Sequence, residues 1–443
     1  LTAKEFNSWF ANGTASENGA VNNANSVDFV HNNNCDFYKW SEQMFLWITS
    51  STNGETVMES PTFYTISPLI VKGKDTVRIL EPHVKGTLLR AIANADKTGK
   101  INTEEGQATD DVLMDKNGNL IYYISMANDV YAEFLTASKE GKMGGKKFPT
   151  TSQERDSIFN YAKANGVDLK DANALAIEIK TSWVIADSLI DTSKYVTIDA
   201  IIPTYTKNKE NTLWLISGER QAKLAMVGMH IVGSASGHPE MIWATFEHNK
   251  NTPNASYQYI NEKGETVTVP ADGDGDWLFN TNVKDNPNVS HMVFSHDSIK
   301  ANKGFTITPS NTVRTKPWGS SYETRPNAED ANPAVANSKV IQLNEAVSKL
   351  LPGNDVRKNY FLIGATWTNG GSAPNGKSYS PNESEQGVAI GSSQLANSTM
   401  ETYAQNGTTY NEYGSCFSCH SNNGLKPTDL SHVYKRIQPL TRK

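Results

Sequence analysis

The chain has 443 residues, a charged fraction of 20% and a net charge of −6. Its length predicts two domains, or one large domain with insertions. The acidic balance argues against nucleic acid or an anionic membrane as the main partner, because both would repel the chain. The longest strongly apolar run, residues 44–48, is far shorter than the roughly 20 residues of a transmembrane helix. The sequence contains no P-loop, dinucleotide-binding fingerprint, Gly-x-Ser-x-Gly elbow or His-Glu-x-x-His helix, which weakens nucleotide-dependent and common hydrolytic functions.

Three segments carry apolar residues at helical spacing. We predict helices over residues 36–50, 152–165 and 337–351. Asn33 or Asn34 can cap the first helix, and a glycine follows each of the three ends. Their apolar stripes indicate helices that pack on a core rather than around a cofactor.

Cys35 lies at the start of the first predicted helix and is one of three cysteines. The other two belong to a C-terminal motif, so Cys35 has no partner for an intrachain disulfide. We expect a free thiol, buried as a small apolar side chain. An intermolecular disulfide, a reactive thiol and an iron ligand are the alternatives. A metal-binding pair with His31 is disfavoured, because the Asn-rich stretch between them looks like a turn.

The middle of the chain is rich in β-branched and aromatic residues and predicts many short strands. They span residues 120–126, 174–186, 195–205, 213–217, 224–232, 241–246, 256–260, 266–269 and 360–367. We therefore predict a mainly β fold with several helices (α+β), built as a β-sandwich or barrel-like body with a small helical C-terminal segment. The body would span residues 1–385 and the C-terminal segment residues 386–443, with long loops over 309–337 and 369–385.

The densest group of histidines comprises His230, His238 and His248. A hairpin would place His238 in its loop and bring the other two towards each other. With Glu240 and Glu247 nearby, these residues could form a transition-metal site or supply an acid/base group. Scattered surface histidines are the favoured interpretation.

Asp272, Asp274 and Asp276 alternate with glycines in a short loop. Hard oxygen ligands at this spacing can surround a calcium ion. The match to an EF-hand loop is partial, because Trp277 replaces the turn glycine and no bidentate Glu ends the loop. A calcium site is therefore an alternative to a solvated acidic hairpin loop.

The most informative motif is Cys416-Phe417-Ser418-Cys419-His420, which ends 23 residues before the C-terminus. Two thiols three residues apart can add to the two vinyl groups of one haem, and the next histidine can bind the iron as its proximal ligand. A redox Cys-x-x-Cys pair would need a thioredoxin-like β-α-β context. A zinc site would need a second Cys/His pair at knuckle spacing. Neither is evident in the sequence.

On this motif the chain resembles c-type cytochromes. The resemblance implies one covalent haem c on Cys416 and Cys419, with His420 as the proximal iron ligand. In small cytochromes c the motif lies on the first helix of the domain, whereas here only residues 421–443 follow it. Residues 394–431 also resemble the ends of large bacterial cytochrome c family proteins with one terminal haem motif, and this second resemblance implies no activity.

Helices predicted over residues 392–405 and 429–437 flank the motif and would hold the haem against the body. A low-spin electron carrier also needs a sixth iron ligand. Met400 and His432 are the first candidates, with a core position and a solvated helix position as their alternatives. The remaining histidines are further candidates: His31, His83, His230, His238, His248, His291 and His296.

These features predict an exported monohaem c-type cytochrome that acts in electron transfer with a redox partner protein. The chain begins at Leu1 rather than Met, as a protein does after removal of a signal peptide, so we expect a periplasmic or extracellular location. One alternative is a haem enzyme, peroxidase or oxygenase-like, that leaves the distal position open for a small-molecule substrate. Another is a β-rich binding protein in which the haem relays electrons.

Overall fold

The structure, a computed structural model, has seven helices in its described part. It describes residues 1–52, 54–84, 88–91, 112–189, 191–289, 291–294, 298–315, 317–319, 335–377, 385–392, 395–402, 416–421 and 424–442. The helices are α1 (Ala3–Trp9), α2 (Asn34–Ile48), α3 (Asp129–Lys139), α4 (Ser152–Ala164), α5 (Val335–Leu350), α7 (Cys416–Cys419) and α8 (Pro427–Leu430). None of the helices in these ranges has the length and apolar character needed to cross a membrane.

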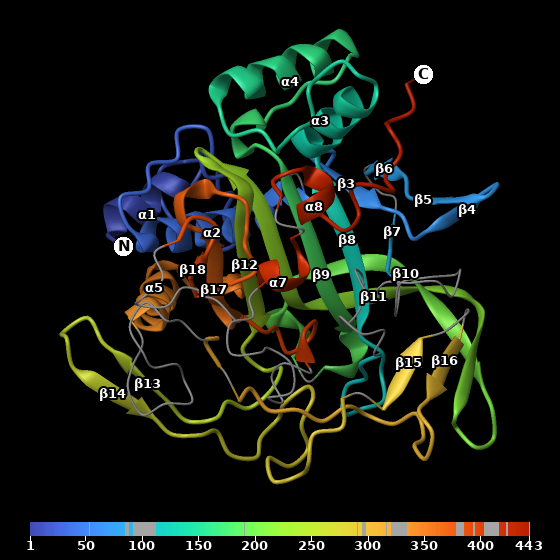
Figure 1. The fold of residues 1–443 in the computed structure, drawn as a ribbon. Coiled ribbons are helices and arrows are strands. Elements are labelled where there is room, and N and C mark those ends of the chain that lie inside the picture. Colours follow the sequence, from blue (N-terminus) through green and yellow to red (C-terminus); the bar gives the residue numbers. More distant parts are fainter. Residues whose placement is uncertain are drawn as a thin grey trace.

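A 12-stranded, mostly antiparallel sheet forms the centre of the molecule (Figure 1). Its main path runs β18-β17-β12-β11-β9-β8-β3-β6, and β10, β7, β16 and β15 extend it from β11. The strands of the main path are β3 (Phe63–Ile66), β6 (Leu80–Pro82), β8 (Tyr122–Asn128), β9 (Ile177–Ile185), β11 (Leu213–Ala235), β12 (His238–His248), β17 (Tyr360–Thr368) and β18 (Ala389–Gly391). The mainly β fold with several helices is confirmed. The sheet is open rather than closed, so the barrel-like alternative is wrong.

The remaining strands lie beside this path or form separate hairpins. Those joined to the sheet are β7 (Leu89–Arg90), β10 (Thr197–Lys207), β15 (Met292–Phe294) and β16 (Ser298–Ala301). Three two-stranded sheets stand apart: β1 (Ser51–Thr52) with β2 (Glu55–Thr56), β4 (Ile70–Lys72) with β5 (Asp75–Val77), and β13 (Tyr257–Ile260) with β14 (Thr266–Val269).

Strand β11 differs most from the prediction, because one strand of 23 residues replaces the two predicted over 213–217 and 224–232. Its first part pairs with β10 and β16, and its second part lies between β9 and β12. The polar stretch 218–223 continues the strand because it pairs with β10, where most of its side chains face solvent. Strand pairing thus outweighs the weak β-propensity of these residues.

The three predicted helices correspond to α2, α4 and α5, with ends shifted by one or two residues. Asn33 caps α2, and a capping box with Asp36 satisfies the first backbone N–H groups. Phe45 of α2 stacks on Phe246 of β12, with ring centroids 4.3 Å apart. Helices α1 and α3 were not predicted. The α3 helix begins directly after β8, with Asn128 as its cap, so no loop signal separates strand from helix.

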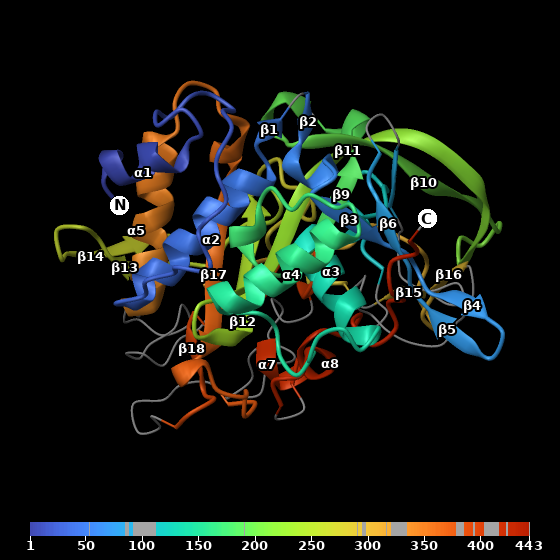
Figure 2. The same ribbon diagram turned by 90° about the horizontal axis from the view of Figure 1, so that it is seen from above.

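The two faces of the sheet carry different side chains. Successive residues of a strand point to opposite faces, so Ile231 of β11 lies on one face and His230 on the other. Helices α2 and α5 pack on the face of Ile231. Figure 2 shows α2 on one side of the sheet and α7 and α8 on the opposite side.

The C-terminal segment is built into the body. Strand β18 pairs with β17 at one edge of the sheet, and Ile437 forms a parallel bridge with Arg78 beyond the other end. The helix predicted over 392–405 is wrong for residues 395–401, which form an irregular segment followed by a turn, while 393–394 and 403–405 lie outside the described residues. The helix predicted over 429–437 is shorter and earlier, because α8 starts at Pro427, a residue that fits a first helical turn.

Candidate haem-binding site

The two motif cysteines lie on one short helical turn. Helix α7 spans Cys416–Cys419, and the backbone N–H of His420 donates to the Cys416 carbonyl at 3.0 Å, which extends the turn to the histidine. Residues three apart on a helix lie on the same side, and both cysteines have free thiols. Burial, with smaller effects from Glu401 and Cys419, raises the pKa of Cys416 to about 12. The arrangement fits two thioether bonds to one porphyrin.

The ring of His420 is held in the orientation that a proximal iron ligand needs. Its Nδ1 lies 3.1 Å from the carbonyl oxygen of Leu430. A carbonyl can only accept, so Nδ1 carries the proton and Nε2 keeps its lone pair. Burial lowers the pKa of His420 well below its usual value, and the nearby charges of His432, Lys180 and His230 lower it further. The neutral ring is the form that binds metals.

Two aromatic rings enclose His420. His432 stacks on it with centroids 3.9 Å apart, and Trp243 of β12 lies 4.5 Å away. The Nε2 of His432 contacts the Cys419 carbonyl oxygen at 3.2 Å. His432 covers the face of the His420 ring instead of facing its Nε2, so it would support His420 as a ligand rather than bind the same metal opposite it.

Met400 lies away from these rings. Its side chain is fully buried in an apolar cluster with Leu113, Tyr123 and Val227. Phe417 of the motif belongs to a different cluster, with Trp243 and residues of α3. Met400 is therefore a buried core residue, which was the alternative to its being the sixth iron ligand.

A polar group on the sheet faces the motif. His230 of β11 pairs with Glu401 through Nε2 and Oε1, 2.8 Å apart, and about a fifth of each side chain is exposed. Lys180 of β9 is the register partner of His230. The charges of His230 and Lys180 act on the pKa of His420, and that of Glu401 acts on Cys416. These electrostatic effects indicate that the His230–Glu401 pair lies near the Cys-x-x-Cys-His motif.

The carboxyl group of Glu401 is ionised in this setting. Burial alone would raise its pKa, but the charge and hydrogen bond of His230, together with Lys180, lower it below its usual value. A carboxylate on one ring nitrogen of a histidine fixes the ring and increases its basicity. His230 is therefore an oriented imidazole beside the candidate haem site.

Residues 397–401 hold this group on the sheet through several buried hydrogen bonds. Asn397 donates to Thr245 Oγ1 at 3.0 Å, and Ser398 donates to Glu247 from both its amide and its hydroxyl. Thr399 lies 2.6 Å from the Ser182 hydroxyl. A Cβ at position 228 would lie 2.5 Å from Thr399 Oγ1, so Gly228 permits this close approach. These side-chain bonds replace the predicted helix with a strap across the sheet.

Polar residues within the strands already indicate a polar face of the sheet, although the strand predictions did not take them into account. Polar residues recur on this face of three adjoining strands: Glu178, Lys180 and Ser182 alternate in β9, His230 lies in β11, and Thr245 and Glu247 lie in β12, with the apolar Val232 and Trp243 among them. A fully buried sheet would have continuous apolar strands. Alternation inside strands of this length indicates a second, polar face, but the sequence does not show what covers it.

The three clustered histidines go to three different places. The β11–β12 hairpin is confirmed, but His238 pairs with Ala235 as the first residue of β12 instead of lying in the loop, and His230 lies opposite Thr245 rather than His248. His230 faces Glu401, His238 bonds to Glu240, and His248 stacks on Tyr195 with its Nε2 directed at the Lys194 carbonyl. Burial lowers the pKa of His248 to about 3. The three histidines are scattered, as predicted, but a surface position is wrong for His238 and His248, which are buried.

The acidic loop does not gather its carboxylates. Asp272 accepts hydrogen bonds from the backbone and side chain of Asn254, Asp274 accepts from the Val283 amide, and Asp276 pairs with Lys116. Within the described ranges, no three or more His, Cys, Asp or Glu side chains converge as a metal site. The structure thus gives each Asp a separate structural partner.

Cys35 is a free thiol in the first turn of α2 and is half-buried rather than fully buried. Burial raises the pKa of its thiol, which lowers its reactivity. His31 lies before the helix and contacts His238 instead of Cys35. The thiol thus forms no disulfide within the chain, and the choice between a free thiol and an intermolecular disulfide stays a prediction.

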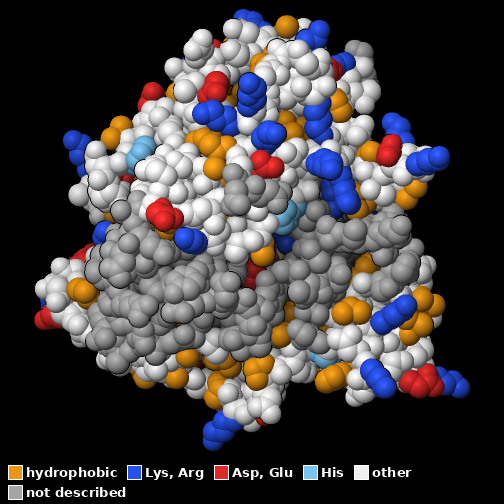
Figure 3. Space-filling view, in the orientation of Figure 1, with side chains coloured by type: hydrophobic (Ala, Val, Ile, Leu, Met, Phe, Trp, Pro, Cys, Tyr) orange, Lys and Arg blue, Asp and Glu red, His pale blue; other side chains and the backbone are white. Residues whose placement is uncertain are grey.

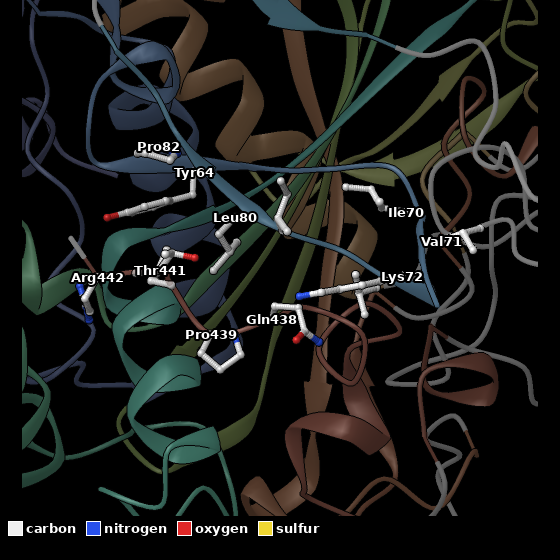
Figure 4. A pocket seen from close by; sticks show the side chains of 13 residues that line it. Tyr64, Ile70, Val71, Lys72, Leu80, Pro82, Gln438, Pro439, Thr441 and Arg442 are labelled. Carbon is white, nitrogen blue, oxygen red and sulfur yellow. The ribbon is translucent and has the colours of Figure 1, made fainter. Parts of the chain in front are cut away.

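A pocket of about 430 Å³ lies elsewhere, between β4 to β6 and the last residues of the chain (Figure 4). Tyr64, Leu80 and Pro439 line it, and Arg442 reaches from its rim to the buried carboxylate of Glu133. No residue of the Cys-x-x-Cys-His motif lines this pocket. It is therefore separate from the candidate haem site.

No family model, curated protein or solved structure matches the chain. The functional conclusion therefore depends on the motif and on the geometry around it.

Proposed function

We propose that this protein is an exported monohaem c-type cytochrome that transfers electrons. The geometry of His420 is the observation that supports the proposal most directly. Its Nδ1 is anchored on the Leu430 carbonyl, and its Nε2 has no hydrogen-bond partner among the described residues. Directly before it, Cys416 and Cys419 occupy one helical turn. A haem bound there would supply a reversible one-electron change at its iron.

The surrounding residues fit such a group. Trp243, Phe417 and Leu430 belong to one apolar cluster beside the motif, which would exclude water from part of a porphyrin. Cys419, on the same side of the turn as Cys416, is exposed and therefore accessible for attachment. In bacteria the attachment of c-type haem is completed outside the cytoplasmic membrane, so the proposal includes a periplasmic or extracellular location.

The sixth ligand in this proposal is His230. It lies upstream of Cys416, as expected for a tail that contains no Met, and its charge acts on His420. Glu401 holds Nε2, which leaves Nδ1 for the iron. A carboxylate on the far nitrogen is a common support for metal-bound histidines.

Covalent attachment is tested by the intact mass of the denatured protein from its native source. The mass should exceed that of the polypeptide by one haem, and this increment should be lost in the Cys416→Ser/Cys419→Ser variant. Two unmodified thiols in the unsubstituted protein would overturn the proposal.

The ligand assignment is tested by optical spectra of the haem-loaded protein. The oxidised protein should be low-spin and bind carbon monoxide slowly. His230→Gln should become high-spin and bind carbon monoxide rapidly, whereas His83→Gln, at a buried histidine outside the site, should keep the original spectrum. A low-spin His230→Gln protein would exclude His230 as the ligand.

The His230–Glu401 pair also favours one alternative, a haem enzyme with an open distal site. An imidazole oriented by a carboxylate can move a proton to or from a bound substrate such as peroxide. A high-spin unsubstituted protein whose peroxide consumption is lost in His230→Gln would support this enzyme and overturn the electron carrier.

A basic surface beside the motif suggests how a redox partner would approach. Figure 3 shows Lys and Arg side chains gathered on the upper part of the face that carries α7 and α8. The loop after α3 carries the exposed Lys142, Lys146 and Lys147, and the C-terminal segment carries the exposed Lys435. Lys139 joins the end of α3 to the Tyr434 carbonyl at 2.7 Å, so the loop after α3 lies next to the C-terminal segment.

Because the whole chain is acidic, this local positive charge would steer an acidic partner to the haem side. Lys142→Glu/Lys146→Glu should slow reduction of ferricyanide, an anionic probe, by about 10-fold at low salt, with a smaller effect at high salt. Lys209→Glu/Lys303→Glu, at exposed lysines after β10 and β16, is the matched control with the same change in net charge. Equal slowing by both variants would contradict a local steering surface.

A further inference from the structure

A second group of chemically active side chains lies at the β11–β12 turn, outside the candidate haem site. His238 is the first residue of β12, and its Nε2 lies 3.3 Å from Nε2 of His31. Its Nδ1 lies 2.8 Å from Oε1 of Glu240. His31 is exposed, whereas His238 and Glu240 are buried.

The hydrogen bonds fix both rings in the same tautomer. Nδ1 of His238 faces a carboxylate and Nδ1 of His31 faces the Phe29 carbonyl at 3.3 Å, and both of these oxygens only accept. Each Nδ1 therefore carries a proton. The two Nε2 atoms then face each other with their lone pairs, which is unfavourable unless a positive species lies between them.

The buried carboxyl group of Glu240 is a second reason to expect a positive charge at the two histidines. Glu240 is fully buried, its Oε1 accepts from His238 and from the Thr368 amide, and its Oε2 has no hydrogen-bond partner among the described residues. No Lys or Arg of the described chain forms an ion pair with Glu240. A buried carboxylate is costly without a compensating cation, and the His31–His238 pair is where that charge can reside.

The distance between the nitrogens matches a tetrahedral metal site. Two imidazole nitrogens bound to zinc at about 2.0–2.1 Å lie about 3.3–3.4 Å from each other at the tetrahedral angle. Phe37 packs edge-on to His238 at 4.9 Å and contacts the ring of His31 at 5.2 Å. These contacts hold the two rings in place without blocking the exposed side of His31.

We propose that His31 and His238 bind one divalent transition-metal ion through their Nε2 atoms, with Glu240 supporting His238 from behind. Imidazole ligands suit zinc, copper and nickel, and oxygen-preferring ions such as calcium and magnesium are disfavoured. The two protein ligands leave the remaining positions of the ion open on the exposed side of His31. The site is independent of the haem.

Zinc titration by isothermal calorimetry tests the site in the haem-loaded protein. One zinc ion should bind, and the binding should be lost in His31→Ala and in His238→Ala. Glu240→Gln should weaken it by about 10-fold to 100-fold, the usual effect of removing a carboxylate behind a ligating histidine. His83 lies near Glu55 and contacts no second histidine among the described residues, so His83→Gln should bind zinc as the unsubstituted protein does.

The titration is repeated in Cys416→Ser/Cys419→Ser, because the proposal predicts zinc binding at His31 and His238 whether or not haem attaches. His31 is exposed, so its replacement leaves the fold intact even if His238→Ala unfolds. Unchanged zinc affinity in His31→Ala would overturn the proposal. The absence of zinc binding to the unsubstituted protein at millimolar zinc would also overturn the proposal. A proton shared between the two rings would then explain their close approach.

Discussion

The two faces of the central sheet come from the same strands but differ in chemistry. On one face, a row across β9, β11 and β12 consists of Ile179, Ile231 and Ala244, buried beneath α2. One residue away along each strand, the row on the opposite face consists of Lys180, His230 and Thr245, beneath the C-terminal segment. The first row contributes apolar burial, whereas the second presents groups that can bind, orient or move charge.

This difference shows how one sheet can serve stability and chemistry together. Apolar burial on the α2 face stabilises the fold at about 25 cal/mol per Å². On the other face, each buried polar group needs a partner, since an unsatisfied group costs more than its hydrogen bond returns. The strap of residues 397–401 supplies these partners and also carries Glu401 to His230.

The largest expected effect comes from breaking a buried ion pair on the polar face. Glu247 and Arg314 are fully buried, with Arg314 Nη2 3.0 Å from Oε2. Arg314→Met leaves Glu247 without its cation and should lower the free energy of unfolding by about 3–5 kcal/mol, measured by urea denaturation.

The double variant Arg314→Met/Glu247→Met is the control, because replacing both charges by apolar groups avoids the unpaired carboxylate. It should recover most of the loss. If the single and double variants lose the same stability, packing around Arg314 matters more than charge, and the contrast between the faces is weaker than proposed.

The second prediction concerns Glu42, a buried ionisable residue in the helix that packs on the apolar face. Glu42 is buried in α2, the helix that packs on the apolar face, and burial raises its pKa to about 8. No described residue forms an ion pair with it, in contrast to Glu247. The folded protein therefore keeps a proton on Glu42 at pH values where the unfolded chain has lost it.

The stability of the fold therefore decreases as the pH rises through the titration of Glu42. The contribution of Glu42 to stability is fully present below about pH 4.5 and falls as the pH rises towards 8, by up to ~1.4 kcal/mol per pH unit. Glu42→Gln should remove this dependence and gain stability over the unsubstituted protein as the pH rises. Parallel pH profiles for the two proteins would show that Glu42 is ionised in the fold.

The sequence predicted the strands and helices that depend on local periodicity, including α2 with its Asn33 cap. It also located the motif from Cys416 to His420 without any structural information. It did not predict that Leu430 would anchor His420, or that Glu401 would pair with His230. These contacts join residues far apart in the chain or depend on turns, and such pairings leave no periodic signal in a single sequence. Residues 403–415 lie outside the described residues, so that part of the predicted tail stays a prediction.

The smallest expected effects on stability come from substitutions of two adjacent residues of β11, one on each face of the sheet. They give the sharpest comparison of the two faces. Ile231→Val removes one buried methylene from the apolar row and should cost about 0.5–1.5 kcal/mol while leaving the spectrum of the haem-loaded protein unchanged. His230→Gln should cost about 1 kcal/mol or less, since its pair with Glu401 is partly exposed, yet it should change the iron spin state. Urea denaturation and optical spectra of both variants measure the two effects. A spectral change in Ile231→Val as large as that in His230→Gln would mean that the faces are coupled through the strand, and that the division of stability and chemistry between them is wrong.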